Sequence, residues 1–146
     1  MPTAAKLVSL IMFAALAWFV SQLVMPLMPD GTEFGFFAEI NAALAGYLGW
    51  RIVGPRAPDS FRAGLSAGLT CALMLFVTAT LFHSFILMLV RSTEARYKGP
   101  IQALKSMFQM ASDFAQPALT PEVVVPLVVG GLVAGFAASA VSRVYS

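Results

Sequence analysis

Few residues of this 146-residue chain could carry chemistry, because only 11% are charged and the sequence contains one histidine. Glu39, Asn41, His83 and Ser84 are the exceptions, since each lies inside a long apolar run. Ionisable groups are costly inside a bilayer and therefore mark polar sites in membrane helices. We predict a small polar cluster of these four residues, in which Glu39 and His83 lie at a comparable depth and could pair.

Two interpretations of this cluster remain open. It could bind an ion or relay a proton, because an imidazole changes its charge near neutrality. Alternatively, Glu39 lies among the lipid headgroups and His83 is a hydrogen-bonded core residue. One glutamate and one histidine have no spacing that defines an ion-binding or catalytic motif. The cluster is therefore a candidate site with two possible roles.

Other classes of chemistry are not indicated by the sequence. Cys71 is the only thiol and the eight methionines are scattered, so we expect neither an internal disulfide nor a metal site. No nucleophile and base are arranged around His83, and no phosphate-binding pattern surrounds Gly130 and Gly131. We expect no enzyme and no cofactor. The net charge of +2 is spread between apolar runs, which argues against nucleic acid as a partner.

The composition indicates that these residues belong to a membrane protein. Hydrophobic residues make up 59% of the chain and the mean hydropathy is +0.82. Soluble domains have about 45–50% apolar and about 25% charged residues. Four apolar runs, residues 4–25, 34–53, 63–90 and 121–141, are long enough to cross a bilayer as helices. We predict an all-α membrane protein in which residues 1–146 form one domain, a four-transmembrane-helix bundle in contact with the lipid bilayer.

The ends of these runs carry further signals. The first run could be a secretory signal peptide, but it continues past Ala17, beyond the usual core of about 7–15 residues. Thr120 precedes Pro121 and is expected to cap the fourth helix with its hydroxyl.

The second run ends in aromatic, basic and helix-breaking residues. Trp50, Arg51 and Arg56 are typical anchors at the membrane interface. Gly54 and Pro55 are expected to end this helix, because proline lacks the amide hydrogen that a helix interior needs.

Residues 97–116, between the third and fourth spans, are too polar to cross a bilayer. Apolar residues recur there at helical spacing, and polar residues fill the opposite face. The apolar residues are Ile101, Leu104, Met107, Phe108, Ala111, Phe114 and Ala115. We predict one amphipathic helix that either lies on the membrane surface or packs over the bundle.

Small residues recur four positions apart in two of the predicted spans. Gly64 and Gly68 form one such pair, and Gly131 and Gly135 form another. Small residues allow helix backbones to approach closely in lipid. We expect these glycines to pack the chain's own helices, with a partner subunit as the less favoured alternative.

The distribution of lysine and arginine predicts the orientation, since basic residues favour the cytoplasmic side. Residues 26–33 contain none, whereas Arg51, Arg56 and Arg62 lie in the second linker and Arg143 lies near the C-terminus. We therefore predict that both termini are cytoplasmic. The long segment 91–120 disagrees, but the rule weakens in long segments. Its basic residues are Arg91, Arg96, Lys98 and Lys105.

Several stretches resemble the TrgA family of small bacterial inner-membrane proteins associated with tellurite resistance. They are residues 1–7, 41–44, 49–57, 96–100 and 119–123, and the motif Gly-Trp-Arg-x-x-Gly-Pro-Arg at 49–56 is the most specific of them. The resemblance covers nearly the whole chain. It implies a multi-pass protein of the bacterial cytoplasmic membrane with a role in tellurium resistance, and it supplies no catalytic residues.

We therefore expect a non-enzymatic membrane protein that contributes to tellurite resistance. One alternative is a small ion or oxyanion transporter that uses the Glu39 and His83 pair and associates with itself. Another is an accessory subunit of a larger respiratory or photosynthetic membrane complex.

Overall fold

The computed structural model of the chain describes residues 4–28 and 33–145, which form helices joined by short loops. The helices are α1 (Ala4–Val24), η1 (Met25–Leu27), α2 (Phe37–Leu48), η2 (Gly49–Val53), α3 (Gly54–Arg56), α4 (Phe61–Thr93), α5 (Pro100–Ala118) and α6 (Pro121–Val144). No strand occurs in these residues, so the all-α prediction is confirmed. Residues 1–3, which belong to the first stretch of the family resemblance, lie outside the described residues.

Three helical segments are long and apolar enough to cross a membrane: Ala4–Leu27, Phe61–Thr93 and Pro121–Val144. They match the first, third and fourth predicted spans. The 33 residues of α4 correspond to about 50 Å of helix, which exceeds a bilayer core of about 30 Å. Its N-terminus is capped by Ser60, whose side chain accepts a hydrogen bond from the Ala63 amide at 3.0 Å. These three helices agree with a membrane protein.

The second predicted span is a helix with a widened turn. α2, η2 and α3 follow one another without a loop, and η2 is a π-helical turn. The Gly54 amide donates to the Gly49 carbonyl, five residues back. Because a proline ring clashes with the carbonyl four residues before it, a wider preceding turn allows Pro55 to remain helical. The prediction that Gly54 and Pro55 end the helix was therefore wrong, and the helix continues to Arg56.

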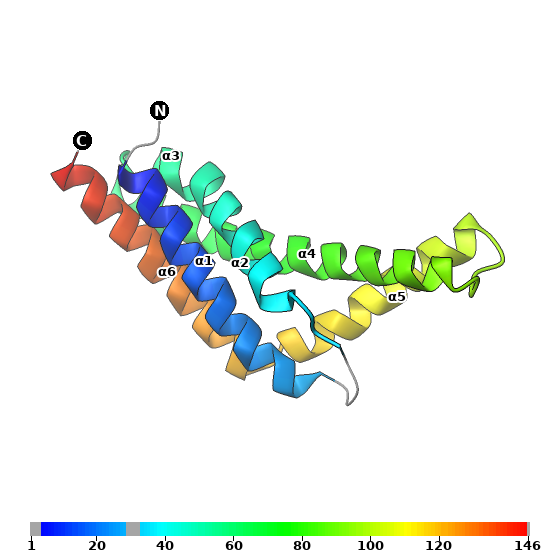
Figure 1. Cartoon of the computed structure of the whole chain (residues 1–146). Coiled ribbons are helices and arrows are strands. Elements are labelled where there is room, and N and C mark those ends of the chain that lie inside the picture. The colour runs from blue at the N-terminus through cyan, green and yellow to red at the C-terminus, as the bar shows by residue number, and fades with distance from the viewer. Residues whose placement is uncertain (1–3, 29–32, 146) are drawn as a thin grey trace.

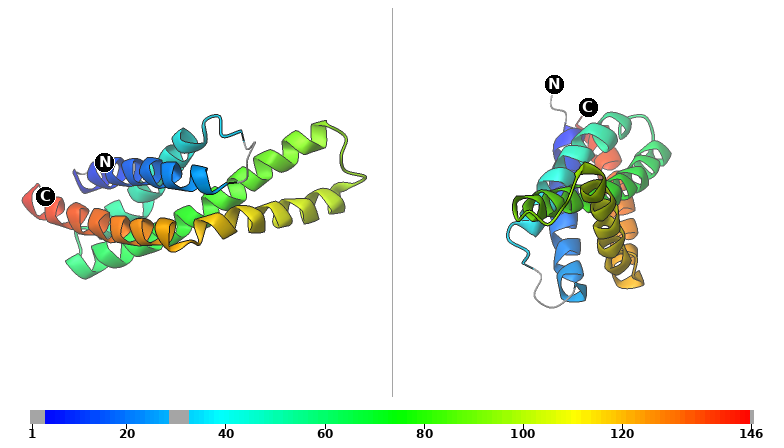
Figure 2. Two further views of the ribbon diagram at one scale, coloured as in Figure 1. Left: turned by 90° about the horizontal axis from the view of Figure 1, so that it is seen from below. Right: turned by 90° about the vertical axis from the view of Figure 1, so that its right-hand side faces the viewer.

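The helices form an elongated bundle in which α1 lies between α2 and α6, and α4 packs against α6 (Figures 1 and 2). The start of α1 and the end of α6 lie at the same end of the bundle. We call this end the terminal end. α4 extends well past the other end of α1, and α5 returns along it to the start of α6. The result is a compact bundle at the terminal end and a protruding α4–α5 hairpin at the other.

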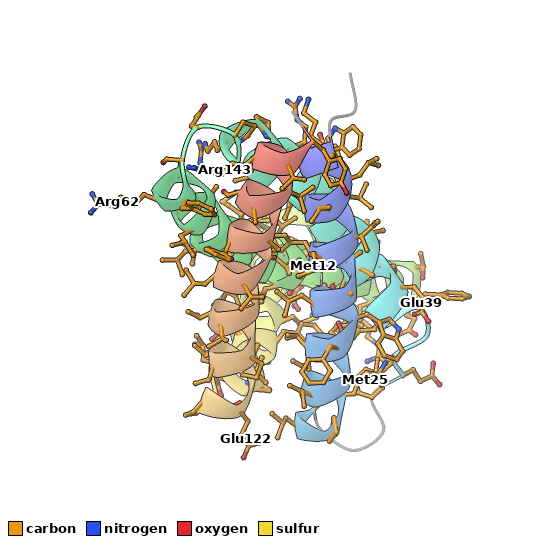
Figure 3. The ribbon with its side chains drawn as sticks, turned by 90° about the vertical axis from the view of Figure 1, so that its left-hand side faces the viewer. Met12, Met25, Glu39, Arg62, Glu122 and Arg143 are labelled. Carbon is orange, nitrogen blue, oxygen red and sulfur yellow. The ribbon has the colours of Figure 1, made fainter. Side chains whose placement is uncertain are left out.

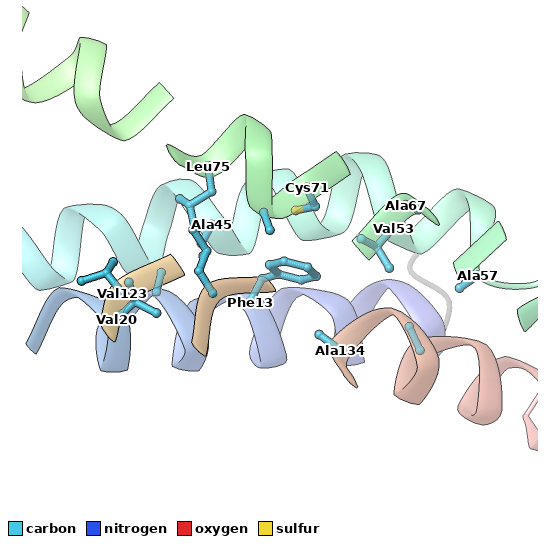
Figure 4. Packing of buried hydrophobic residues seen from close by; sticks show 14 of the residues in the cluster. Phe13, Val20, Ala45, Val53, Ala57, Ala67, Cys71, Leu75, Val123 and Ala134 are labelled. Carbon is cyan, nitrogen blue, oxygen red and sulfur yellow. The ribbon is translucent and has the colours of Figure 1, made fainter. Parts of the chain in front are cut away.

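The core lies where α1 meets the other helices. α1 turns one face inward at intervals of about four residues, the spacing of one helix face. The buried residues of this face are Ala5, Ser9, Phe13, Ala17, Val20, Ser21 and Val24. Among the described residues, Phe13 is the largest fully buried side chain, and Figure 4 shows it among core residues of the neighbouring helices. Small residues on the same face allow α2 and α6 to approach α1 on either side of this ring.

The glycine pairs of α4 and α6 pack against each other. A β-carbon on Gly64 would lie 2.7 Å from the Gly135 carbonyl oxygen, and one on Gly68 would overlap the Gly131 carbonyl oxygen. Conversely, a β-carbon on Gly135 would overlap the Gly64 carbonyl oxygen. The two backbones are thus close enough that only glycine fits at these positions. These glycines pack helices of the same chain.

The second predicted span finishes with Trp50 and Arg51, and these residues lie at the terminal end of the bundle, beside the start of α1. The Lys6 ammonium group is 6.0 Å from the centre of the Trp50 ring, and Trp50 is half-buried. Arg51 and Arg56 are exposed. Thus the three predicted anchors lie at one end of the bundle.

The segment predicted as an amphipathic helix, residues 97–116, folds as α5, which begins three residues after the predicted start. Met110 is buried, whereas the apolar residues Ile101, Leu104 and Phe108 are exposed. These three residues form a stripe, defined here as the α5 stripe, that does not pack on the rest of the chain. Thr120 does not cap α6 as predicted, because its hydroxyl donates to the Pro117 carbonyl at 2.9 Å.

Candidate functional site

A chain of hydrogen bonds links α1, α2 and α4 in the half of the bundle away from the terminal end. The Ser21 hydroxyl donates to the Ala17 carbonyl at 2.7 Å. The Asn41 amide nitrogen Nδ2 donates to the Ser21 hydroxyl oxygen at 2.9 Å. His83 Nε2 lies 2.9 Å from the other end of the amide, Asn41 Oδ1. Ser21, Asn41 and His83 are called the polar chain below.

The order of donors along the polar chain determines which nitrogen of His83 carries a proton. Because the Ser21 hydroxyl gives its hydrogen to a carbonyl, it must accept from the Asn41 amide. The amide then presents its carbonyl oxygen, which can only accept, to His83. Nε2 of His83 is therefore a donor, and Nδ1 is the nitrogen that keeps a lone pair in the neutral ring.

Aromatic rings hold the His83 side chain in place. The Phe37 ring lies 4.5 Å from the imidazole, centre to centre, and is tilted by 37°. The Phe82 ring meets it edge to face, with 5.9 Å between centres. Such contacts add about 0.5–1.5 kcal/mol each beyond the burial of area. The imidazole is thus positioned by Asn41 on one nitrogen and by rings around it.

His83 lies between two hollows. An inner cavity of about 70 Å³ lies between α1, α2, α4, α5 and α6, and its polar lining residues are Ser21, Asn41, Thr80 and His83. An outer cleft of about 640 Å³ lies between the start of α2, the second half of α4, and α5. The cleft is apolar apart from His83 and the three charged residues Glu33, Arg91 and Asp113. Both hollows therefore reach the same imidazole.

Glu39 does not belong to this arrangement. Its side chain is exposed, and Figure 3 shows it on the outer side of α2. Among the described residues, the hydrogen-bond partner of His83 is Asn41 and not Glu39. Two residues along an α-helix turn by about 200°, so Glu39 and Asn41 face opposite directions. The predicted pairing of Glu39 with His83 is not present.

Ser84 is buried, but it does not extend the polar chain. Its hydroxyl donates to the Thr80 carbonyl of the same helix at 2.7 Å. Of the four predicted site residues, the structure brings together Asn41 and His83. Glu39 is exposed instead, and Ser84 bonds within its own helix.

Ser21 was missed in the sequence analysis. A serine in an apolar run does not by itself indicate a polar site, because its hydroxyl can donate a hydrogen bond to the backbone carbonyl four residues back. Ser9 and Ser21 both do so. The available signal was the four-residue spacing of small residues Ala5, Ser9, Ala17 and Ser21, which marks the buried face of α1. With that buried face recognised, Ser21 would have been the expected hydrogen-bond partner of Asn41 in the neighbouring span.

The arrangement can hold a hydrogen-bonding group at a fixed imidazole in an apolar setting. No protein-family model, no curated protein and no solved structure matches this chain.

Proposed function

We propose that the chain crosses the membrane four times, with both termini cytoplasmic. The helix from Phe37 to Arg56 has 20 residues, which corresponds to about 30 Å, the thickness of a bilayer core. A crossing by this helix also agrees with the position of the ends of α1 and α6 at the same end of the bundle.

The charges at the two ends of the bundle support this orientation. The terminal end carries five basic residues and the α4–α5 hairpin at the other end carries four: Lys6, Arg51, Arg56, Arg62 and Arg143 against Arg91, Arg96, Lys98 and Lys105. Figure 3 shows Arg62 and Arg143 at this end and Glu122 at the other. The excess of basic residues favours the cytoplasm for the terminal end. The α5 stripe supports a position of α5 at the opposite membrane surface, since it leaves an apolar face free for lipid.

We propose further that the protein contributes to tellurite resistance in the bacterial cytoplasmic membrane without acting as an enzyme. The observation that carries this proposal is the resemblance of residues 49–56 to the TrgA family. Those residues form the π turn and the end of the second helix, and Gly49 and Gly54 lie against α1 there. The motif therefore has a structural role in the bundle, and the tellurite role would depend on the intact bundle rather than on a reactive residue in the motif.

Deletion of the gene is expected to lower the tellurite concentration that stops growth and to be rescued by the wild-type chain. The measurement is growth at graded tellurite concentrations, together with cellular tellurium content. Gly54→Leu should fail to rescue, because a β-carbon at Gly54 would lie 3.0 Å or less from Lys6 atoms of α1. Gly99→Leu is the matched control, since a β-carbon at Gly99 would meet nothing within 4 Å. Unchanged tolerance after deletion would contradict the proposal.

The polar chain favours a second candidate function, a small transporter. A hydrogen-bonded histidine within an apolar helix, next to a cleft with charged residues, is typical of ion or proton pathways. Tellurium content separates the two candidates. Lower tolerance with unchanged content supports the first, whereas a raised content in the deletion strain that Asn41→Leu fails to reverse supports transport.

A further inference from the structure

The structure points to a ligand site at His83: we propose that the outer cleft binds a quinol-type amphiphile, with a ring hydroxyl donating a hydrogen bond to Nδ1 of His83. A quinol-type amphiphile is here a lipid-soluble aromatic ring with two hydroxyl groups and an apolar tail. This inference rests on the position of His83 in a membrane bundle and is independent of the tellurite role.

Nδ1 of His83 is available to a ligand. The hydrogen bond of His83 is made by Nε2. Among the described residues, no buried side-chain nitrogen or oxygen lacks a hydrogen-bond partner. Nδ1 has no such partner and is therefore not fully buried, and the His83 side chain lines both the inner cavity and the outer cleft. In the neutral ring it is an acceptor, because the polar chain keeps the proton on Nε2.

The outer cleft has a size and walls that suit a small aromatic ligand. Its volume of about 640 Å³ lies within the range of about 300–1,000 Å³ for small-molecule sites. Phe34, Phe37 and Phe114 line it beside His83, and offset or edge-to-face contacts with these rings favour an aromatic ligand. Ile86 and Val90 of α4 continue the apolar wall for a tail.

The charges of the outer cleft disfavour anionic ligands. A phosphate headgroup or another oxyanion would meet the lone pair of Nδ1 and the carboxylates of Glu33 and Asp113, against Arg91 alone. A neutral ligand with hydroxyl donors avoids this repulsion. Its first hydroxyl fits Nδ1, and the carboxylates of the cleft can accept from a second hydroxyl. A quinol has both hydroxyls on one ring.

The polar chain also predicts a preference for the reduced form. A quinone has carbonyl oxygens only, which accept hydrogen bonds and find no donor on the neutral His83 ring at Nδ1. The quinol is therefore expected to bind about tenfold more tightly than the quinone, the value of one hydrogen bond. Asn41 is a positioning residue in this account, because it fixes the proton on Nε2.

Binding can be measured with the full chain in phosphatidylcholine nanodiscs under argon, using decylubiquinol and decylubiquinone as probes and native mass spectrometry as readout. His83→Gln keeps a donor near the Nε2 position but places no acceptor at the Nδ1 position, so its quinol affinity should fall about tenfold. Ser84→Ala is the control and should bind like the wild type. Asn41→Leu should reduce the preference for quinol over quinone, because either ring nitrogen can then carry the proton.

A second readout uses the fact that His83 is the only histidine. Nitrogen-15 labelling of histidine gives the signals of this one imidazole, and decylubiquinol should shift the Nδ1 signal while Nε2 stays protonated. Equal affinity for the two redox forms, or unchanged quinol affinity in a folded His83→Gln protein, would overturn the proposal. So would an Nδ1 signal that does not respond to quinol.

Discussion

Replacing Gly68 by isoleucine is expected to separate α4 from α6 and to lower the free energy of unfolding by about 3 kcal/mol. The reason is steric, since a β-carbon at this position would overlap the Gly131 carbonyl oxygen and lie 3.3 Å from the Gly135 α-carbon. Backbone atoms cannot move aside as the end of a flexible side chain can. In lipid, close packing is the main source of helix association, so no hydrophobic drive compensates for the lost contact.

Unfolding by increasing fractions of sodium dodecyl sulfate in mixed micelles, followed by circular dichroism, measures this effect. Ser66→Ile is the matched control, because it places the same side chain on the same helix at an exposed position. The control should change the unfolding free energy by less than about 0.5 kcal/mol. Equal effects of the two substitutions would contradict the close packing of α4 on α6.

Replacing Asn41 by leucine is expected to cost about 2 kcal/mol of unfolding free energy. Leucine has a similar shape but bonds to neither neighbour, so the Nε2 donor of His83 loses its acceptor. Hydrogen bonds between membrane helices contribute about 0.6 kcal/mol on average and about 1.7 kcal/mol at most, and the lost partner adds the cost of an unsatisfied donor.

The same detergent titration measures this second effect, with Glu39→Gln as the control on the same helix. Glu39 is exposed and should be near neutral. The double variant Asn41→Leu with His83→Phe should be more stable than the sum of the single effects predicts, because both partners of one hydrogen bond are then removed together. A larger loss of unfolding free energy for Glu39→Gln than for Asn41→Leu would contradict the structure and favour Glu39 as the partner of His83.

The sequence predicted the helices of this fold well, because apolar length is a strong signal in a chain of this composition. The boundaries of α1, α4 and α6 fall within about three residues of those expected. The end of the second helix was misjudged at Gly54 and Pro55, since sequence rules treat proline as a helix breaker and do not foresee the π turn that accommodates it. The length of the third run, residues 63–90, already indicated a tilt or an extension beyond the headgroups, but the return of α5 along α4 was not predicted, because hydropathy does not show how helices pack.

The candidate site was predicted in part. Burial cost singled out His83 and Asn41, which are hydrogen-bonded to each other in the structure, but the choice of Glu39 as partner relied on depth in the membrane alone. Helix rotation decides such pairings, and Asn41 rather than Glu39 shares a face with the buried residues Ala38 and Ala45 of α2. Ser21 could not be identified as the partner of Asn41 before the packing of α1 on α2 was known, because the sequence contains several serines that could equally well accept this hydrogen bond.

The crossing of the membrane by the helix from Phe37 to Arg56 is tested most directly by labelling single cysteines on either side of it. In a chain with Cys71 replaced by serine, Glu33→Cys, Asp59→Cys and Tyr145→Cys each introduce one thiol at an exposed position. A membrane-impermeant maleimide added to intact cells should label Glu33→Cys, and it should reach Asp59→Cys and Tyr145→Cys only after the cells are opened. Labelling of Glu33→Cys and Asp59→Cys from the same side would contradict four crossings.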